Sequence, residues 1–301
     1  MVRYPAAIGF YPADRDNLIK EIEKCFLHPY GPGQLPTDKK QNQKIMFGGI
    51  SPHAGYIFSG PVAAHLYYAL ASQKPPKTVI LLGPSHMYPV DGAAIARGED
   101  WATPLGVIKI DDMLVLEILN SIDNIMENNY AHKNEHSLEV QLPFLQYIYG
   151  NEFKIVPIAI GSHNLDALTE IGSGIADVIK EKLDDVIVIT SSDFTHYGAG
   201  YGYAPAGSGP VSKILDWMYT HDQEAIEYII KLDEKGFFNY VKEHDMTICG
   251  FAPITSLIVI AKQLGISNAT LLKYATSWDT NEAYRSSSQI VGYAAISFSL
   301  K

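Results

Sequence analysis

Residues 78–86 read TVILLGPSH, and this short stretch indicates the architecture of the whole chain. Its first five residues are apolar or β-branched without alternation, which is typical of a strand covered on both faces, as in a parallel sheet. Glycine and proline then end the strand, and His86 follows. Two other stretches repeat the arrangement, KIMFGGISPHAGY at 44–56 and VIVITSSDFTHY at 186–197.

Strand-like runs of this kind alternate with helical patterns along the chain. Strands are predicted at 44–50, 78–82, 153–160, 186–190, 269–276 and 289–298. Helices are predicted at 14–28, 60–72, 112–121, 136–148, 164–182, 209–231, 233–243 and 250–264. A hairpin is expected to pair 93–96 with 107–110 across a turn at 103–106. This alternation favours an α/β fold, and we predict a single αβα layered domain over residues 1–301.

The totals exclude several classes of protein. The chain has 301 residues, of which 47% are hydrophobic and 19% charged, as in an ordinary globular protein. A net charge of -10 argues against a nucleic-acid partner. No apolar run approaches the ~18 residues of a membrane span. With only two cysteines, Cys25 and Cys249, a disulfide framework is not expected, and a reducing cytoplasm is predicted.

Five polar residues follow the predicted strands or precede a helix: His53, His86, Asp193, His196 and Cys249. Ligands of α/β sheets bind in the crevice at the carboxyl ends of the strands. Imidazole, carboxylate and thiolate groups that converge there suit a site for one transition metal ion.

Each of these residues also has a purely structural interpretation. A lone loop histidine is commonly held by a backbone carbonyl, but His53 and His86 follow two separate strands, which is harder to dismiss. Asp193 either caps a turn and bonds His196, or orients that imidazole for metal binding or proton transfer. Cys249 is either a small buried apolar group or a thiol whose pKa is lowered by the start of the next helix.

Three further residues are weaker candidates for contacts to a ligand or support of the site. His136 begins a predicted helix, and Tyr56 and Tyr197 lie beside the crevice histidines in sequence. The tyrosines also have a bland explanation, because the chain contains 19 of them. A nucleophilic pair of Cys249 with His196 or His86 is another mechanism, but it gives His53 and Asp193 no role.

At these motifs the chain resembles the Memo-like family. The signatures are PHAGYIFSG at 52–60, GPSH at 83–86, EHSLE at 135–139, SDFTHY at 192–197 and CG at 249–250. The resemblance runs from Tyr4 to Ala295 and so covers nearly the whole chain. It implies the αβα fold of class III extradiol dioxygenases, which are non-haem iron enzymes.

The resemblance also implies roles for individual residues. His53, His86 and Cys249 would occupy the metal-ligand positions, His196 would match the catalytic acid/base histidine, and Asp193 would lie beside it. The expected cofactor is one transition metal ion, iron or copper first and zinc third. Cys249 replaces a carboxylate ligand, so ring cleavage of the dioxygenase type is not expected.

Two functions follow from the resemblance and stay open at this point. One is a metal-dependent oxidoreductase acting on an unidentified small molecule or peptide in the pocket. The other is a non-catalytic protein that uses a vestigial pocket to bind a phosphotyrosine-like peptide. Microbial members of the family are often grouped with a radical-SAM protein and an AMMECR-type protein, which are therefore predicted partners.

Overall fold

The computed structural model describes residues 1–37, 45–286 and 289–300. Its strands are β1 (Val2–Arg3), β2 (Met46–Ser51), β3 (Thr78–Pro84), β4 (Ala93–Ile95), β5 (Asp100–Thr103), β6 (Gly106–Ile110), β7 (Ile125–Glu127), β8 (Lys154–Ile160), β9 (Val186–Ser191), β10 (His196–Tyr197), β11 (Asn268–Thr276) and β12 (Ile290–Ser299).

The helices are α1 (Arg15–Leu27), α2 (Tyr56–Ala71), α3 (Asp112–Leu119), α4 (Asn129–His132), α5 (Leu142–Tyr149), α6 (Leu165–Ile179), α7 (Val211–Ile230), α8 (Glu234–Glu243), α9 (Phe251–Gln263) and α10 (Ser277–Thr280). Four short 3-10 segments complete the elements: η1 (Glu139–Gln141), η2 (Lys180–Lys182), η3 (Ala199–Tyr201) and η4 (Glu282–Tyr284).

One sheet runs through the molecule in the order β1-β5-β6-β8-β3-β9-β2-β12-β10. Its centre, β8-β3-β9-β2, is parallel, and β12 joins it antiparallel beside β2. The residues of β2, β3 and β9 are all buried, as expected for strands covered on both faces. Because these three strands run in the same direction, the segments that follow them emerge at one edge of the sheet.

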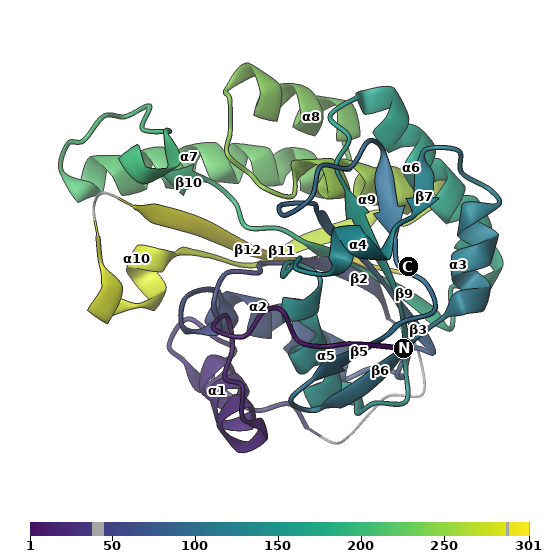
Figure 1. Ribbon diagram of the computed structural model, residues 1–301. Helices are drawn as coiled ribbons and strands as arrows, with labels where there is room; N and C mark the ends of the chain where they lie inside the picture. The colour runs from purple at the N-terminus through teal and green to yellow at the C-terminus, as the bar shows by residue number, and fades with distance from the viewer. Residues whose placement is uncertain (38–44, 287–288, 301) are drawn as a thin grey trace.

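Helices cover both faces of this sheet (Figure 1). On one face α2 packs on β2, β11 and β12, and also contacts α1 and α5. On the other face α9 packs on β3 and β9, with α6 and α8 beside it. The predicted α/β fold is confirmed. Among the described residues, no helix is both long enough and apolar enough to pass through a bilayer.

The predicted hairpin between 93–96 and 107–110 is wrong. The hairpin joins β5 to β6 instead, and Gly106, the first residue of β6 after the turn, has φ +134°. The reason is that two strands pair with the same edge of β8. β6 pairs with the first residues of β8, whereas β4 pairs with residues 158–160 at the end of β8. The other edge of β4 pairs with β7.

Two predicted helices begin elsewhere. The helix expected from residue 60 starts at Tyr56, whose backbone N–H donates to the carbonyl of Phe10. The helix expected at 136–148 begins as η1 at Glu139 and becomes α5 at Leu142. His136 therefore lies in the turn before a helix. The other predicted helices and strands agree within a few residues, and Lys44, which opened one predicted strand, lies outside the described residues.

Candidate metal centre

The segments after β2, β3 and β9 line a cavity of about 530 Å³ at the carboxyl edge of the sheet. His53, His86, His136, Asp193 and His196 all contribute to its lining. His53, His86 and Asp193 each follow one of the parallel strands β2, β3 and β9, so the sheet itself brings these three residues together. His136 comes from the turn before η1, which lies over the same edge.

Three of these imidazoles form a cluster that could hold a metal ion: His53, His86 and His136. One ring nitrogen of each lies within 4.8 Å of the other two. The ring centroids are 5.3 Å apart for His53 and His86, 5.5 Å for His53 and His136, and 5.0 Å for His86 and His136. Metal-bound imidazoles lie about 2.0–2.1 Å from the ion, so a small inward movement of the rings would be enough to bind one.

A buried carboxylate, Glu135, orients His86. Its Oε1 lies 3.0 Å from His86 Nδ1, and its Oε2 accepts the backbone N–H of His86 at 2.6 Å. A carboxylate only accepts hydrogen bonds, so Nδ1 carries the hydrogen and the Nε2 lone pair is left for a metal. Burial acts to raise the pKa of Glu135, but the hydrogen bonds and electrostatic interaction with His86, together with the backbone N–H of Ser137, outweigh it and lower that pKa.

His53 is buried beside the sulfur of Cys249. Its Nε2 lies 3.2 Å from Cys249 Sγ and 4.0 Å from Asp193 Oδ2. Burial, followed by repulsion from His86 and His136, lowers the pKa of His53 well below its usual value. The ring is therefore neutral at pH 7, the form that binds metals.

Cys249 precedes α9, as the sequence indicated, but its thiol behaves differently from the expectation. Burial, reinforced by the Asp193 carboxylate, raises the pKa of Cys249. The backbone N–H of Asp193 points at the sulfur at 3.3 Å and offsets only part of this. The thiol is therefore protonated in the absence of a cation, and a bound metal ion would favour its thiolate form. Cys249 is not part of the three-histidine group.

Asp193 connects the loop after β2 to the loop after β9. Its Oδ1 accepts the backbone N–H of His53 at 2.8 Å and that of Ala54 at 3.2 Å. Burial raises the pKa of Asp193, while His196 and these two hydrogen bonds act in the opposite direction. The carboxylate therefore fixes the backbone of His53 and faces the imidazoles.

His196 lies in the same cavity with its orientation fixed by backbone groups. Its Nδ1 lies 3.0 Å from the carbonyl oxygens of both Phe194 and Thr247. Carbonyls accept hydrogen bonds, so Nδ1 carries the hydrogen and Nε2 is the nitrogen able to accept a proton. Tyr201 packs edge-on against this ring at 5.1 Å.

The start of the chain supports the turn that carries His136. Arg3 Nη1 lies 2.5 Å from Glu139 Oε2, and both side chains are buried. Glu139 also accepts hydrogen bonds from the backbone of Ala6 and Ala7 and from the Tyr11 hydroxyl. Phe10, between these anchors, stacks on the His136 ring with centroids 4.3 Å apart.

The two predicted tyrosine contacts lie outside the cavity lining. Tyr56 is buried and donates to the carbonyl of Val140 at 2.7 Å. Tyr197 is buried against Trp217 and donates to the carbonyl of Gly207 at 2.7 Å. The aromatic residues that do line the cavity include Phe10, Phe58, Tyr201, Tyr284 and Tyr293, which the sequence did not single out.

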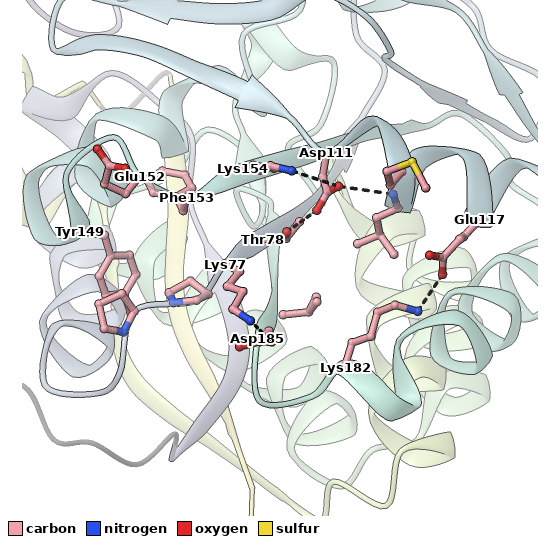
Figure 2. Close-up of a pocket in the computed structure, with 15 residues that line it drawn as sticks. Lys77, Thr78, Asp111, Glu117, Tyr149, Glu152, Phe153, Lys154, Lys182 and Asp185 are labelled. Atoms are coloured by element: carbon pink, nitrogen blue, oxygen red, sulfur yellow. Dashed lines mark hydrogen bonds and ion pairs between the residues drawn. The ribbon is translucent and has the colours of Figure 1, made fainter.

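A second cavity, of about 670 Å³, lies at the amino ends of β3, β8 and β9 (Figure 2). Its lysines point toward neighbouring acids: Lys77 lies 2.8 Å from Asp185, and Lys182 lies 2.7 Å from Glu117. Among the described residues, no group of potential metal ligands lies in the lining of this cavity. The candidate metal-binding group of the described residues therefore lies at the opposite, carboxyl edge of the sheet.

Fold and site together define an α/β protein with a histidine cluster at the carboxyl edge of its sheet. A family model described as Memo-like protein matches residues 3–297. MEMO1 family proteins of Methanopyrus kandleri and Sulfurisphaera tokodaii are 43% and 41% identical to this chain, each over 99% of both proteins. The chain belongs to the Memo family.

One solved structure, an uncharacterized protein from Escherichia coli K12, aligns with a TM-score of 0.49 and 10% sequence identity. The alignment covers 83% of this chain and 99% of the other.

Proposed function

We propose that this protein holds one transition metal ion, iron or copper, and uses it for redox chemistry on a small molecule bound in the cavity. The observation that supports this most strongly is the cluster of His53, His86 and His136, whose ligating nitrogens lie within 4.8 Å of one another. Imidazole suits iron, copper and zinc, and a neighbouring sulfur favours the softer metals. When bound, iron or copper supplies one-electron exchange with oxygen or substrate.

In this proposal His53 and His86 are constant ligands, and the third ligand is either His136 or Cys249. The geometry favours His136, because its ring nitrogen completes the cluster. The family resemblance favours Cys249, whose sulfur lies 3.2 Å from His53 Nε2.

The remaining residues act on protons and on the ligand. His196 presents Nε2 to the cavity and is proposed to take or give a proton there. Asp193 holds the loop of His53 by accepting two of its backbone N–H groups. The aromatic lining, with Phe58 packed edge-on against Tyr284 at 5.4 Å, suits an apolar or aromatic part of a substrate.

The experiment is an anaerobic titration of chelator-treated protein with iron(II) and copper(I), followed by oxygen-uptake measurements. We expect one equivalent to bind to the wild type, and binding to be strongly weakened in His86→Ala. His65→Ala is the matched control, because His65, which lies on α2, hydrogen-bonds the carbonyl of Tyr30 and is not among the residues that line the cavity. A wild-type protein that binds neither metal would end the proposal.

The same titration identifies the third ligand. His136→Ala and Cys249→Ser are compared, with cobalt(II) as an additional probe because cobalt bound to thiolate shows a sulfur-to-metal charge-transfer band. Loss of affinity in His136→Ala with no sulfur band assigns His136. The band in the wild type and its loss in Cys249→Ser assign Cys249.

A second candidate function is supported by the aromatic lining: binding of a peptide through an aromatic or phosphorylated side chain without catalysis. The two functions differ in their dependence on metal. Saturable binding of a phosphotyrosine peptide to chelator-treated protein, unchanged in His86→Ala, would favour the binding function. The radical-SAM and AMMECR-type partners remain predictions from the family resemblance, and a cytoplasmic location remains a prediction from the presence of only two cysteines.

A further inference from the structure

The hydroxyl of Ser191, at the end of β9, has three buried neighbours. Its Oγ lies 2.9 Å from His53 Nδ1, 2.7 Å from Gln141 Nε2 and 2.7 Å from the carbonyl oxygen of Ser137. Ser191, Ser137 and His53 are at most 2% exposed. Protein groups must therefore satisfy every hydrogen-bonding position of this hydroxyl.

The orientation of the Gln141 side chain is set by groups on its other sides. Its Nε2 donates to the carbonyl oxygen of Pro52 at 3.0 Å, and its Oε1 accepts the hydroxyl hydrogen of Tyr67 at 2.5 Å. A flipped amide would place Oε1 against the Pro52 carbonyl, which has no hydrogen to give. The nitrogen of Gln141 therefore faces Ser191 and donates to it.

A serine hydroxyl donates one hydrogen and accepts two. Gln141 fills one acceptor position of Ser191, and the carbonyl of Ser137 takes the hydrogen. The remaining acceptor position faces His53 Nδ1, so this nitrogen must carry the hydrogen. The lone pair of His53 is then on Nε2, which lies 3.2 Å from Cys249 Sγ and 4.0 Å from Asp193 Oδ2.

We infer that Ser191 is a positioning residue, assisted by Gln141, that keeps a hydrogen on Nδ1 of His53 before any metal binds. A ligand imidazole must present an unprotonated nitrogen to the metal, and its other nitrogen usually donates to a fixed acceptor. For His86 the acceptor is a carboxylate, whereas for His53 it is a neutral hydroxyl. The purpose of this arrangement rests on the proposed function, but the arrangement itself is a property of the metal-free protein.

The test reads the tautomer directly. The protein is labelled with ¹⁵N-histidine, treated with chelator and examined at pH 7 by two-bond ¹⁵N–¹H correlation spectra, which distinguish protonated from bare ring nitrogens. Comparison with His53→Asn assigns the signals. We expect Nδ1 of His53 to be protonated and Nε2 bare in the wild type.

Three variants locate the cause. Ser191→Ala removes the acceptor, and its His53 should lose the single tautomer. Gln141→Met leaves the Ser191 hydroxyl in place but removes one donor, so an intermediate loss is expected. Thr190→Val is the matched control, because Thr190 is buried one residue earlier on β9 and its hydroxyl has no hydrogen-bond partner within the described part of the chain. It should keep the wild-type tautomer.

Affinity for zinc, measured by competition with a chromophoric chelator, is the second readout. Loss of a group that orients a ligand histidine typically costs about 10–100-fold in metal affinity, so Ser191→Ala should bind zinc more weakly by that factor. Thr190→Val should bind like the wild type.

A wild-type His53 protonated at Nε2 overturns the inference, whether or not the variants fold. So does an unchanged tautomer in Ser191→Ala, or an equal loss in Thr190→Val. The proposed function can fail separately. If the wild type binds no metal but loses its tautomer in Ser191→Ala, the inference on Ser191 stands and the metal function does not.

Discussion

Replacing Arg3 with methionine tests how firmly the start of the chain is tied to the site. Arg3 is buried and makes three polar contacts: an ion pair with Glu139 at 2.5 Å and hydrogen bonds to the carbonyls of His132 and Glu135, both at 2.8 Å. It also packs over the Trp101 ring at 4.2 Å. Methionine fills a similar volume but leaves the Glu139 charge without its cation.

The expected loss is about 3–5 kcal/mol, the usual cost of removing one partner of a buried ion pair. Unfolding entropy near 60 °C is about 2.1 cal/mol/K per residue, or about 0.6 kcal/mol/K for a chain of 301 residues. The melting temperature should therefore fall by about 5–8 °C.

The assay is differential scanning calorimetry of the metal-free protein, so that metal binding does not contribute to stability. Lys231→Met is the control, because it removes an exposed ion pair with Glu227, which is worth about 0.3–0.5 kcal/mol. A melting temperature of Arg3→Met no lower than that of the control would show that the Arg3 network does not stabilise the fold.

Three other outcomes are expected. Burial raises the pKa of Asp222 to about 6, so the native state binds this proton more tightly than the unfolded state does. The contribution of Asp222 to stability therefore falls as pH rises from about 4 to 6. Over that range, the free energy of unfolding of the wild type, measured with urea, should fall relative to that of Asp222→Asn by on the order of 3 kcal/mol. Iodoacetamide should modify Cys249 in chelator-treated protein at pH 7 more slowly than it modifies an unfolded cysteine, because the pKa of this thiol is raised; mass spectrometry that found equal rates would contradict this. Gly48→Ala should cost at least about 3 kcal/mol in chemical denaturation or abolish soluble expression, because an added Cβ would lie 1.8 Å from the carbonyl oxygen of Val188.

The sequence was most informative where a strand ends. Unbroken apolar runs predict buried parallel strands, and parallel strands deliver their next residues to one edge, so His53, His86 and Asp193 could be placed together without a structure. The hairpin was harder to predict from the sequence. β4 and β6 both pair with one edge of β8, and the local sequence does not show which of them pairs with which part of that edge.

The roles of His136 and Cys249 were harder to foresee. His136 reaches the cluster because the turn before η1 is held over the sheet edge by Glu135, Glu139 and the first residues of the chain, which are contacts between distant segments. The motif EHSLE contains His136 and the two glutamates that hold its turn, but the sequence alone does not show that this packing brings His136 to the cluster. For Cys249, the position before α9 was predicted correctly, while the effect of burial on the pKa of its thiol depends on the packing around the sulfur.

The position of β12 has a consequence for how the protein is made. This strand, the last in the described chain, pairs with β2, which lies near the beginning. At about 5–20 residues per second, roughly 10–50 s pass between translation of these two strands. During that interval the apolar edge of β2 has no β12 to cover it, and such an edge is prone to aggregation. A ribosome that stalls before residue 290 would therefore leave a nascent chain that depends on chaperones.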